Sequence, residues 1–158
     1  MFYKYLVVFL VSMIPLIELR GAIPVALGYG LPLVPSYALA VVGNMIPVPL
    51  IFLFGRRFLA WGKDRAMIGK FCTWCLEKGV TASKQLELKA KNGLYIALML
   101  FVGIPIPGTG AWSGTLAASF LNMDFKKSVI FVMLGIFLAG VIMLVASYGV
   151  FGAISLVK

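Results

Sequence analysis

Glu18 and Arg20 are the residues whose type and position point most directly to chemistry. They are the only charged residues between Lys4 and Arg56, within a stretch that is otherwise apolar or uncharged. Charged side chains are costly inside a bilayer and mark ion or substrate paths where they occur. Proline and glycine surround the pair, so we expect an unwound stretch that holds both side chains in one cavity. The alternative is a buried ion pair that only neutralises itself and locks the fold.

A second group of candidate residues lies in the break Gly103-Ile-Pro-Ile-Pro-Gly-Thr-Gly110. Glycine lets the backbone approach a ligand or a facing segment closely, and hydroxyl groups supply hydrogen bonds. A half-helix is expected to start after a glycine in each break, at Ala22 and at Ala111. Such helix N-termini would point their N–H groups at the centre and favour an anion. Tight packing through small residues is the alternative. The candidate proton- or substrate-binding residues from the two breaks are Glu18, Arg20, Gly21, Pro24, Pro105, Pro107, Gly108, Thr109, Gly110 and Ser113.

Enzymatic and metal chemistry have little support in the composition. The chain has no histidine, which removes the commonest general base and a common metal ligand. Cys72-Thr-Trp-Cys75 is a C-x-x-C motif, but no second pair completes a zinc site. We expect two reduced cysteines, with a redox pair or an intersubunit metal site as the alternative. No catalytic residue, cofactor or metal is therefore predicted.

The elements that must position these residues belong to a membrane protein. Of the 158 residues 62% are apolar and 12% are charged, and the mean hydropathy is +1.05. Soluble domains carry about 25% charged residues. A globule of this length cannot bury such an apolar excess, so lipid must cover part of it, and one membrane domain is expected.

The uncharged runs are too long for single spans and are interrupted near their middles. Residues 92–123 form one such run of 32, whereas a bilayer core of about 30 Å needs roughly 20 helical residues. Half-length segments on both sides of a break indicate a re-entrant hairpin. We therefore predict an all-α membrane fold, an inverted repeat of hairpin plus transmembrane helix. Its parts are hairpin 1–31, transmembrane helix 35–54, basic amphipathic cytoplasmic segment 56–91, hairpin 92–123 and transmembrane helix 125–149. Gly21 and Gly110, 89 residues apart, and Gly43 and Gly135, 92 apart, mark equivalent points.

Charge distribution predicts the orientation. Nine of the 14 basic residues lie between positions 56 and 91, which the positive-inside rule places in the cytoplasm, with the termini outside. Contact with anionic lipid headgroups explains this basic segment better than nucleic acid, which we exclude as a partner. Helical spacing places five apolar residues on one face of a helix lying on the inner leaflet, with Gly79 ending it; they are Phe58, Trp61, Ile68, Phe71 and Cys75.

The stretches Ile17-Glu-Leu-Arg-Gly-Ala-Ile-Pro24 and Pro105-Ile-Pro-Gly-Thr-Gly-Ala-Trp-Ser-Gly114 resemble the putative small multidrug export protein family of bacteria and archaea. The similarity covers nearly the whole chain and includes Gly43-Asn44, which adds Asn44 to the candidate site. That family is distantly similar to the DedA group, whose paired re-entrant hairpins carry an acidic residue and an arginine. This sequence departs from the DedA pattern, because Thr109 stands where an acidic residue would follow Pro-Gly and the second hairpin has no arginine.

These observations favour a multi-pass cell-membrane protein that acts as a small, proton-coupled secondary transporter, expected to be a homodimer. It would move an amphipathic small molecule or lipid through a mid-membrane site between the hairpins. Glu18 would bind and release the proton, and Arg20 would engage an anionic group or tune Glu18. The resemblance implies drug export. A DedA-like flippase for an anionic lipid-phosphate carrier and a non-transporting assembly or lipid-organising protein are the alternatives.

Overall fold

The computed structural model describes residues 2–15, 17–65, 68–89, 93–106 and 108–156, in which helices alternate with short turns and no strand occurs. The high apolar content favours helices because each helix satisfies its own backbone hydrogen bonds. The elements are α1 (Phe2–Met13), α2 (Glu18–Gly28), α3 (Leu33–Met45), α4 (Pro47–Leu50), the π-helical turn η1 (Ile51–Gly55), α5 (Arg56–Gly62), α6 (Gly69–Lys89), α7 (Leu94–Gly103), α8 (Ala111–Phe120) and α9 (Phe125–Leu156).

Two of the described helices are long and apolar enough to cross a membrane, which supports the predicted membrane class. The first runs without a loop for 30 residues from Leu33 to Gly62, through α3, α4, η1 and α5. The second is the Phe125–Ser147 part of α9, with 23 residues. The predicted span 35–54 lies inside the first helix, which continues past Phe54 into the basic region and ends at Gly62.

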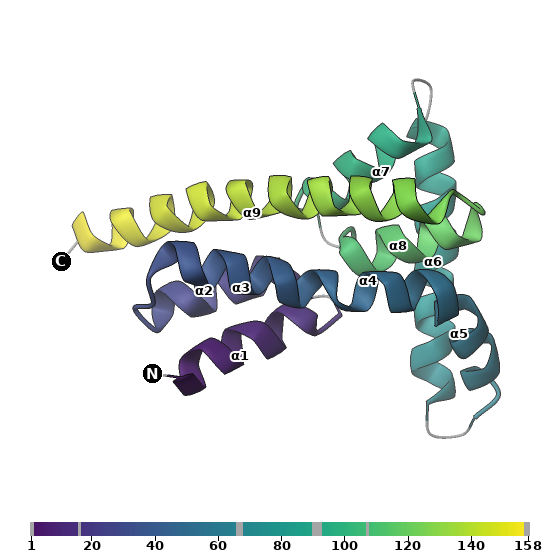
Figure 1. Cartoon of the computed structure of the whole chain (residues 1–158), viewed down its shortest axis with the longest axis horizontal. Helices are drawn as coiled ribbons and strands as arrows, with labels where there is room; N and C mark the ends of the chain where they lie inside the picture. The colour runs from purple at the N-terminus through teal and green to yellow at the C-terminus, as the bar shows by residue number, and fades with distance from the viewer. Residues whose placement is uncertain (1, 16, 66–67, 90–92, 107, 157–158) are drawn as a thin grey trace.

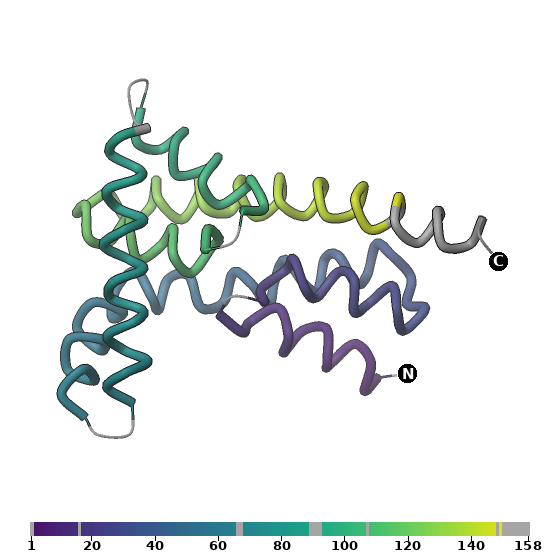
Figure 2. Tube along the Cα trace, turned by 180° about the vertical axis from the view of Figure 1, so that it is seen from behind, coloured from purple at the N-terminus to yellow at the C-terminus, as the bar shows by residue number. Residues whose placement is uncertain are grey.

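The short helices approach the two long ones from opposite ends (Figure 1). α1 and α2 lie side by side and reach inward from the end that holds the start of α1 and the end of α9 (Figures 1 and 2). α7 and α8 reach inward from the other end, so the α1–α2 turn and the α7–α8 loop meet in the middle of the molecule. Leu19, Leu98 and Ile136, each no more than 1% exposed, bring α2, α7 and α9 together in one core.

The same close contact occurs once in each half of the chain. A Cβ atom on Gly43 of α3 would lie 2.9 Å from the carbonyl oxygen of Phe9 in α1. A Cβ atom on Gly135 of α9 would lie 2.7 Å from the carbonyl oxygen of Met99 in α7. Each glycine therefore lets a short helix rest directly on a long one.

The basic segment differs from the single amphipathic helix predicted through Phe58 and Cys75. It forms two helices, because α5 continues the first long helix to Gly62 and α6 starts anew at Gly69. α6 runs across the ends of the long helices (Figure 1). The expected helix end at Gly79 is also wrong, since this residue lies inside α6, where a Cβ atom would overlap the ring of Phe120. Packing against α8 thus keeps the glycine within the helix. The face of α6 that becomes buried contains Cys72, Cys75, Gly79, Ala82 and Leu86.

Candidate functional site

Glu18 lies at the meeting point of the two halves, at the start of α2. Its backbone adopts φ +52°, which turns the chain from α1 into α2. The side chain is 5% exposed and points at α8. Its Oε2 accepts a hydrogen bond from the Ala111 N–H at 3.1 Å, and its Oε1 accepts one from the Trp112 N–H at 3.0 Å. The carboxylate therefore caps the N-terminus of α8, where N–H groups lack intrahelical partners and the helix dipole favours negative charge.

This cap changes two of the predictions from sequence. The α8 N-terminus does begin at Ala111, but the two N–H groups expected to face an anionic ligand are bound by the protein's own carboxylate. The other half-helix does not begin at Ala22, because α2 starts at Glu18 and the Gly21 N–H already donates to the Ile17 carbonyl at 3.0 Å. The turn between α1 and α2 ends at Glu18, so α2 starts before Gly21 and not after it.

Gly110 provides the space that the cap requires. Its φ of +154° lies in a region that residues with side chains rarely adopt, and a Cβ atom there would overlap the Glu18 carboxylate. The absence of a side chain at Gly110 thus lets the carboxylate approach the first turn of α8.

Arg20 binds the other side of the same break, the C-terminus of α7. Its guanidinium donates to the carbonyl oxygens of Ile106 at 2.9 Å and of Val102 and Ile104 at 3.1 Å. It also donates to the Thr109 hydroxyl at 3.2 Å. Carbonyl groups at the end of a helix lack N–H partners and carry negative partial charge. The N–H groups of the guanidinium supply the missing hydrogen bonds.

Glu18 and Arg20 are thus not held in one unwound stretch, as the sequence had indicated. Both belong to the first turn of α2, where residues two apart point in different directions. The Glu18 carboxylate binds the N-terminus of α8, and the Arg20 guanidinium binds the C-terminus of α7. Each charge is therefore hydrogen-bonded to a helix end and not to the other charge. The two residues instead hold the two ends of the α7–α8 break.

A third charge completes this pattern at the far end of α8. Arg56 donates to the Ser119 carbonyl oxygen and to the Asn122 side-chain oxygen, both at 3.1 Å. Its guanidinium also lies 5.4 Å from the centre of the Phe120 ring. For Arg56 the sequence suggested an orientation signal and contact with anionic lipid headgroups, not a contact with α8. α8 therefore has a carboxylate at its N-terminus and a guanidinium at its C-terminus, both favourable to its dipole.

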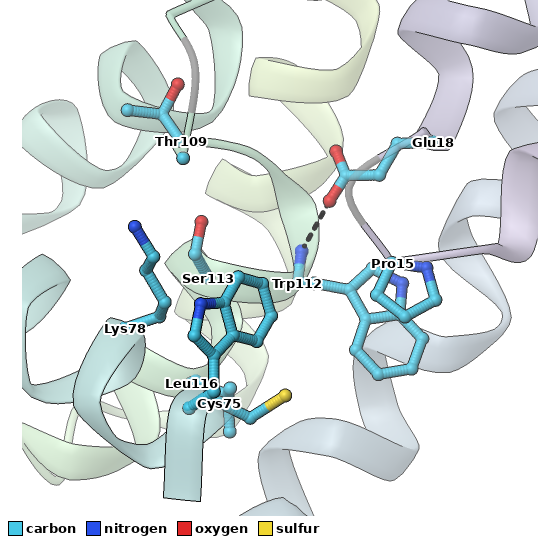
Figure 3. Close-up of a pocket in the computed structure, with 10 residues that line it drawn as sticks. Pro15, Glu18, Cys75, Lys78, Thr109, Trp112, Ser113 and Leu116 are labelled. Atoms are coloured by element: carbon cyan, nitrogen blue, oxygen red, sulfur yellow. Dashed lines mark hydrogen bonds between the residues drawn. The ribbon is translucent and has the colours of Figure 1, made fainter. Parts of the chain in front are cut away.

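Next to the Glu18 carboxylate is a small cavity of about 40 Å³, which has room for a single water-sized group (Figure 3). Ser113 lies between Glu18 on one side and Lys78 of α6 on the other (Figure 3). The residues that line it are Pro15, Glu18, Trp74, Cys75, Lys78, Gly108, Thr109, Trp112, Ser113 and Leu116. The cavity therefore joins the first break, the second break and α6.

An apolar groove of about 370 Å³ adjoins this cavity. The two share Pro15, Cys75, Trp112 and Leu116 in their walls. None of the described residues that line the groove carries a charge. A volume of this size is typical of sites for small organic molecules.

The structure brings together four of the other candidate residues around Glu18. Gly108, Thr109 and Ser113 line the cavity, and Gly110 lies against the carboxylate. The remaining candidates lie elsewhere. Gly21 and Pro24 are inside α2, Asn44 is buried in α3, Pro105 is in the segment after α7, and Pro107 lies outside the described residues.

The sequence did not reveal the part that α6 plays in this site. Lys78, Trp74 and Cys75 line the cavity, yet they resemble any other residues of a basic surface helix. Lys78 is four residues from Trp74 and three from Cys75, a spacing that places side chains on one side of a helix, but nothing in the sequence paired that side with α8. Cys72 and Cys75 are free thiols, and the described residues contain no group of three metal-binding side chains.

Comparison with known proteins gives one match. The family model described as "Putative small multi-drug export protein" matches residues 18–142. No curated protein and no solved structure is significantly similar to the chain. The matched region begins at Glu18 and includes α2, Arg56 and the residues that line the cavity apart from Pro15. The family's description is that of an export protein.

Proposed function

We propose that this chain, which belongs to the putative small multi-drug export protein family, is a proton-coupled secondary transporter in which Glu18 carries the proton. In this proposal the long helices Leu33–Gly62 and α9 cross the bilayer. The pairs α1–α2 and α7–α8 enter from opposite sides as re-entrant hairpins and form an inverted repeat. The equivalent contacts at Gly43 and Gly135 support the repeat.

The orientation is proposed from the basic residues of α5, of α6 and of the segment 63–65 between them. Arg57, Lys63, Arg65, Lys70 and Lys84 are exposed at one end of the molecule, which we place in the cytoplasm. α6 would then lie along the inner leaflet, since it runs across the ends of the long helices (Figure 1). The start of α1 and the end of α9 would face the opposite side.

The single observation that carries the coupling proposal is the cap of α8 by Glu18. As a carboxylate, Glu18 holds the N–H groups of Ala111 and Trp112, and its cavity has room for a water-sized group that could deliver a proton. Protonation removes the charge and turns one acceptor oxygen into a hydroxyl group, so both bonds weaken. α8 would then separate from the α1–α2 turn and open the path between the hairpins.

This arrangement favours proton coupling over a site for an anionic lipid phosphate. The DedA-like alternative relied on free N–H groups at the half-helix N-terminus, and here Glu18 occupies them. The guanidinium of Arg20 is likewise bound to carbonyl oxygens of the second hairpin. An anion entering this centre would have to compete with both.

Transport in reconstituted liposomes tests the proposal. We expect wild-type protein to move ethidium, a permanently charged drug, when a pH gradient is imposed, and the rate to follow the gradient. Glu18→Gln should abolish this dependence because an amide does not exchange the proton. Glu87→Gln is the matched control, since Glu87 is an exposed carboxyl on α6.

Two outcomes would contradict the proposal. Ethidium movement by Glu18→Gln with an unchanged pH dependence would exclude Glu18 as the carrier. Wild-type liposomes that show no gradient-driven movement would favour a non-transporting assembly or lipid-organising protein.

A further inference from the structure

The apolar groove beside Glu18 is not explained by proton binding alone. Its wall is built by α4, η1 and α5 on one side and by α6 and α8 on the other. Leu50, Phe54, Phe58 and Phe71 line it and remain 51–58% exposed. In the proposed orientation these side chains face lipid, so the groove is open to molecules dissolved in the bilayer.

The groove adjoins the cavity that holds the Glu18 carboxylate, and Glu18 is the one acidic side chain among the described residues that line either space. Pro15 and Trp112 belong to both the groove and the Glu18 cavity. Each Glu18 oxygen accepts one N–H bond from α8, and a carboxylate oxygen can accept a second. The indole ring of Trp112 adds an aromatic surface of the kind that attracts cations.

We infer that the groove and the cavity form one binding site for an amphipathic amine. Its apolar, aromatic body would lie in the groove, and its single ammonium group would enter the cavity and donate to Glu18. The cavity of about 40 Å³ has room for a group the size of an ammonium. This inference rests on the proposed function, for which it names the substrate class.

The charges of the site distinguish a cationic ligand from an anionic one. Lys78 lines the cavity opposite Glu18 but does not line the groove (Figure 3). For an amine, Lys78 is a competing positive charge, so its removal should tighten binding. For a carboxylate or phosphate ligand, Lys78 would be the partner, and its removal should weaken binding.

Three probes with the same apolar body test the inference on wild-type protein: 4-phenylbutylamine, 4-phenylbutanol and 4-phenylbutanoate. Binding is measured by calorimetry in an uncharged detergent at neutral pH, without any gradient. We expect the amine to bind at least tenfold more tightly than the alcohol and the carboxylate to bind most weakly. Equal affinities, or tightest binding of the carboxylate, would overturn the inference.

Variants test where the amine binds and distinguish a loss of binding from a loss of folding. Leu50→Trp fills the groove and should weaken amine binding at least tenfold. Leu53→Trp is the matched control, because Leu53 has the same 58% exposure on the same helix but does not line the groove. Lys78→Gln should tighten amine binding. Weakened amine binding in Lys78→Gln, or equal effects of the two tryptophan variants, would contradict the site.

These results remain distinct from those of the proton-coupling experiment. If the amine fails to bind the groove while Glu18 still controls pH-driven ethidium movement, the substrate class is wrong and the transporter proposal stands. If the amine binds as expected and no gradient-driven movement occurs, the site exists without proton coupling.

Discussion

The Glu18 carboxylate caps a helix that begins 93 residues later, with its Oε2 3.1 Å from the backbone nitrogen of Ala111. A second bond to Trp112 engages the other oxygen at 3.0 Å. One buried carboxylate therefore holds the first turn of α8 at the start of α2, and its contribution can be measured by substitution.

Glu18→Gln should lower the stability of the protein as well as its proton response. The amide oxygen can accept one of the two N–H bonds, whereas the amide nitrogen would face the other N–H donor. A buried donor without a partner costs about 1–3 kcal/mol. Thermal unfolding in detergent should show a lower midpoint for Glu18→Gln and an unchanged one for the exposed Glu87→Gln. Equal midpoints would show that the cap contributes nothing to stability.

Arg20→Lys should destabilise the α7–α8 break although it keeps the positive charge. The guanidinium donates to three carbonyl oxygens and the Thr109 hydroxyl at once. A lysine ammonium is more compact and cannot reach all four acceptors together. We expect a loss of about 1–3 kcal/mol, since hydrogen bonds to charged groups are among the stronger ones. Arg57→Lys, at an exposed position, is the control. Similar unfolding curves for both variants would argue against this role.

Gly110→Ala should disrupt the cap from the other side. A methyl group would overlap the Glu18 carboxylate, and the backbone there adopts a conformation that costs other residues about 1–3 kcal/mol. Gly28→Ala provides the comparison, because a Cβ atom at Gly28 meets nothing within 4 Å. Lower unfolding temperature and lost pH response are expected for Gly110→Ala alone. A wild-type response in that variant would show that the close approach is dispensable.

Labelling of single cysteines should place α6 and the start of α9 on the same side of the membrane. In a background without Cys72 and Cys75, cysteines at Lys84 and Lys126, which are exposed, should react with an impermeant maleimide only from the cytoplasm. A cysteine at Tyr3, 67% exposed on α1, should react only from outside. Reaction of positions 84 and 126 from opposite sides would eliminate the proposed hairpin topology.

Composition and spacing were sufficient to predict several features of this protein. The apolar excess indicated a helical membrane protein because isolated charges and unpaired backbone groups are costly in lipid. Proline and glycine indicated the break before α8, which begins at Ala111 where the sequence placed it, whereas Gly21 and Pro24 of the other predicted break lie inside α2. Glu18 and Arg20 stood out because charges are rare in such a chain.

Only the tertiary structure decided what those residues contact. Local sequence suggested that Glu18 and Arg20 share a cavity, yet α2 begins at Glu18 and sends the two side chains to different helix ends. Lys78 and the apolar groove depend on the packing of α6 against α8. Helix periodicity specifies which residues share a face, but it contains no information on which distant face will cover it. Contacts between residues about 90 positions apart arise when the helices pack through their apolar surfaces. This packing determines which groups Glu18 and Arg20 bind.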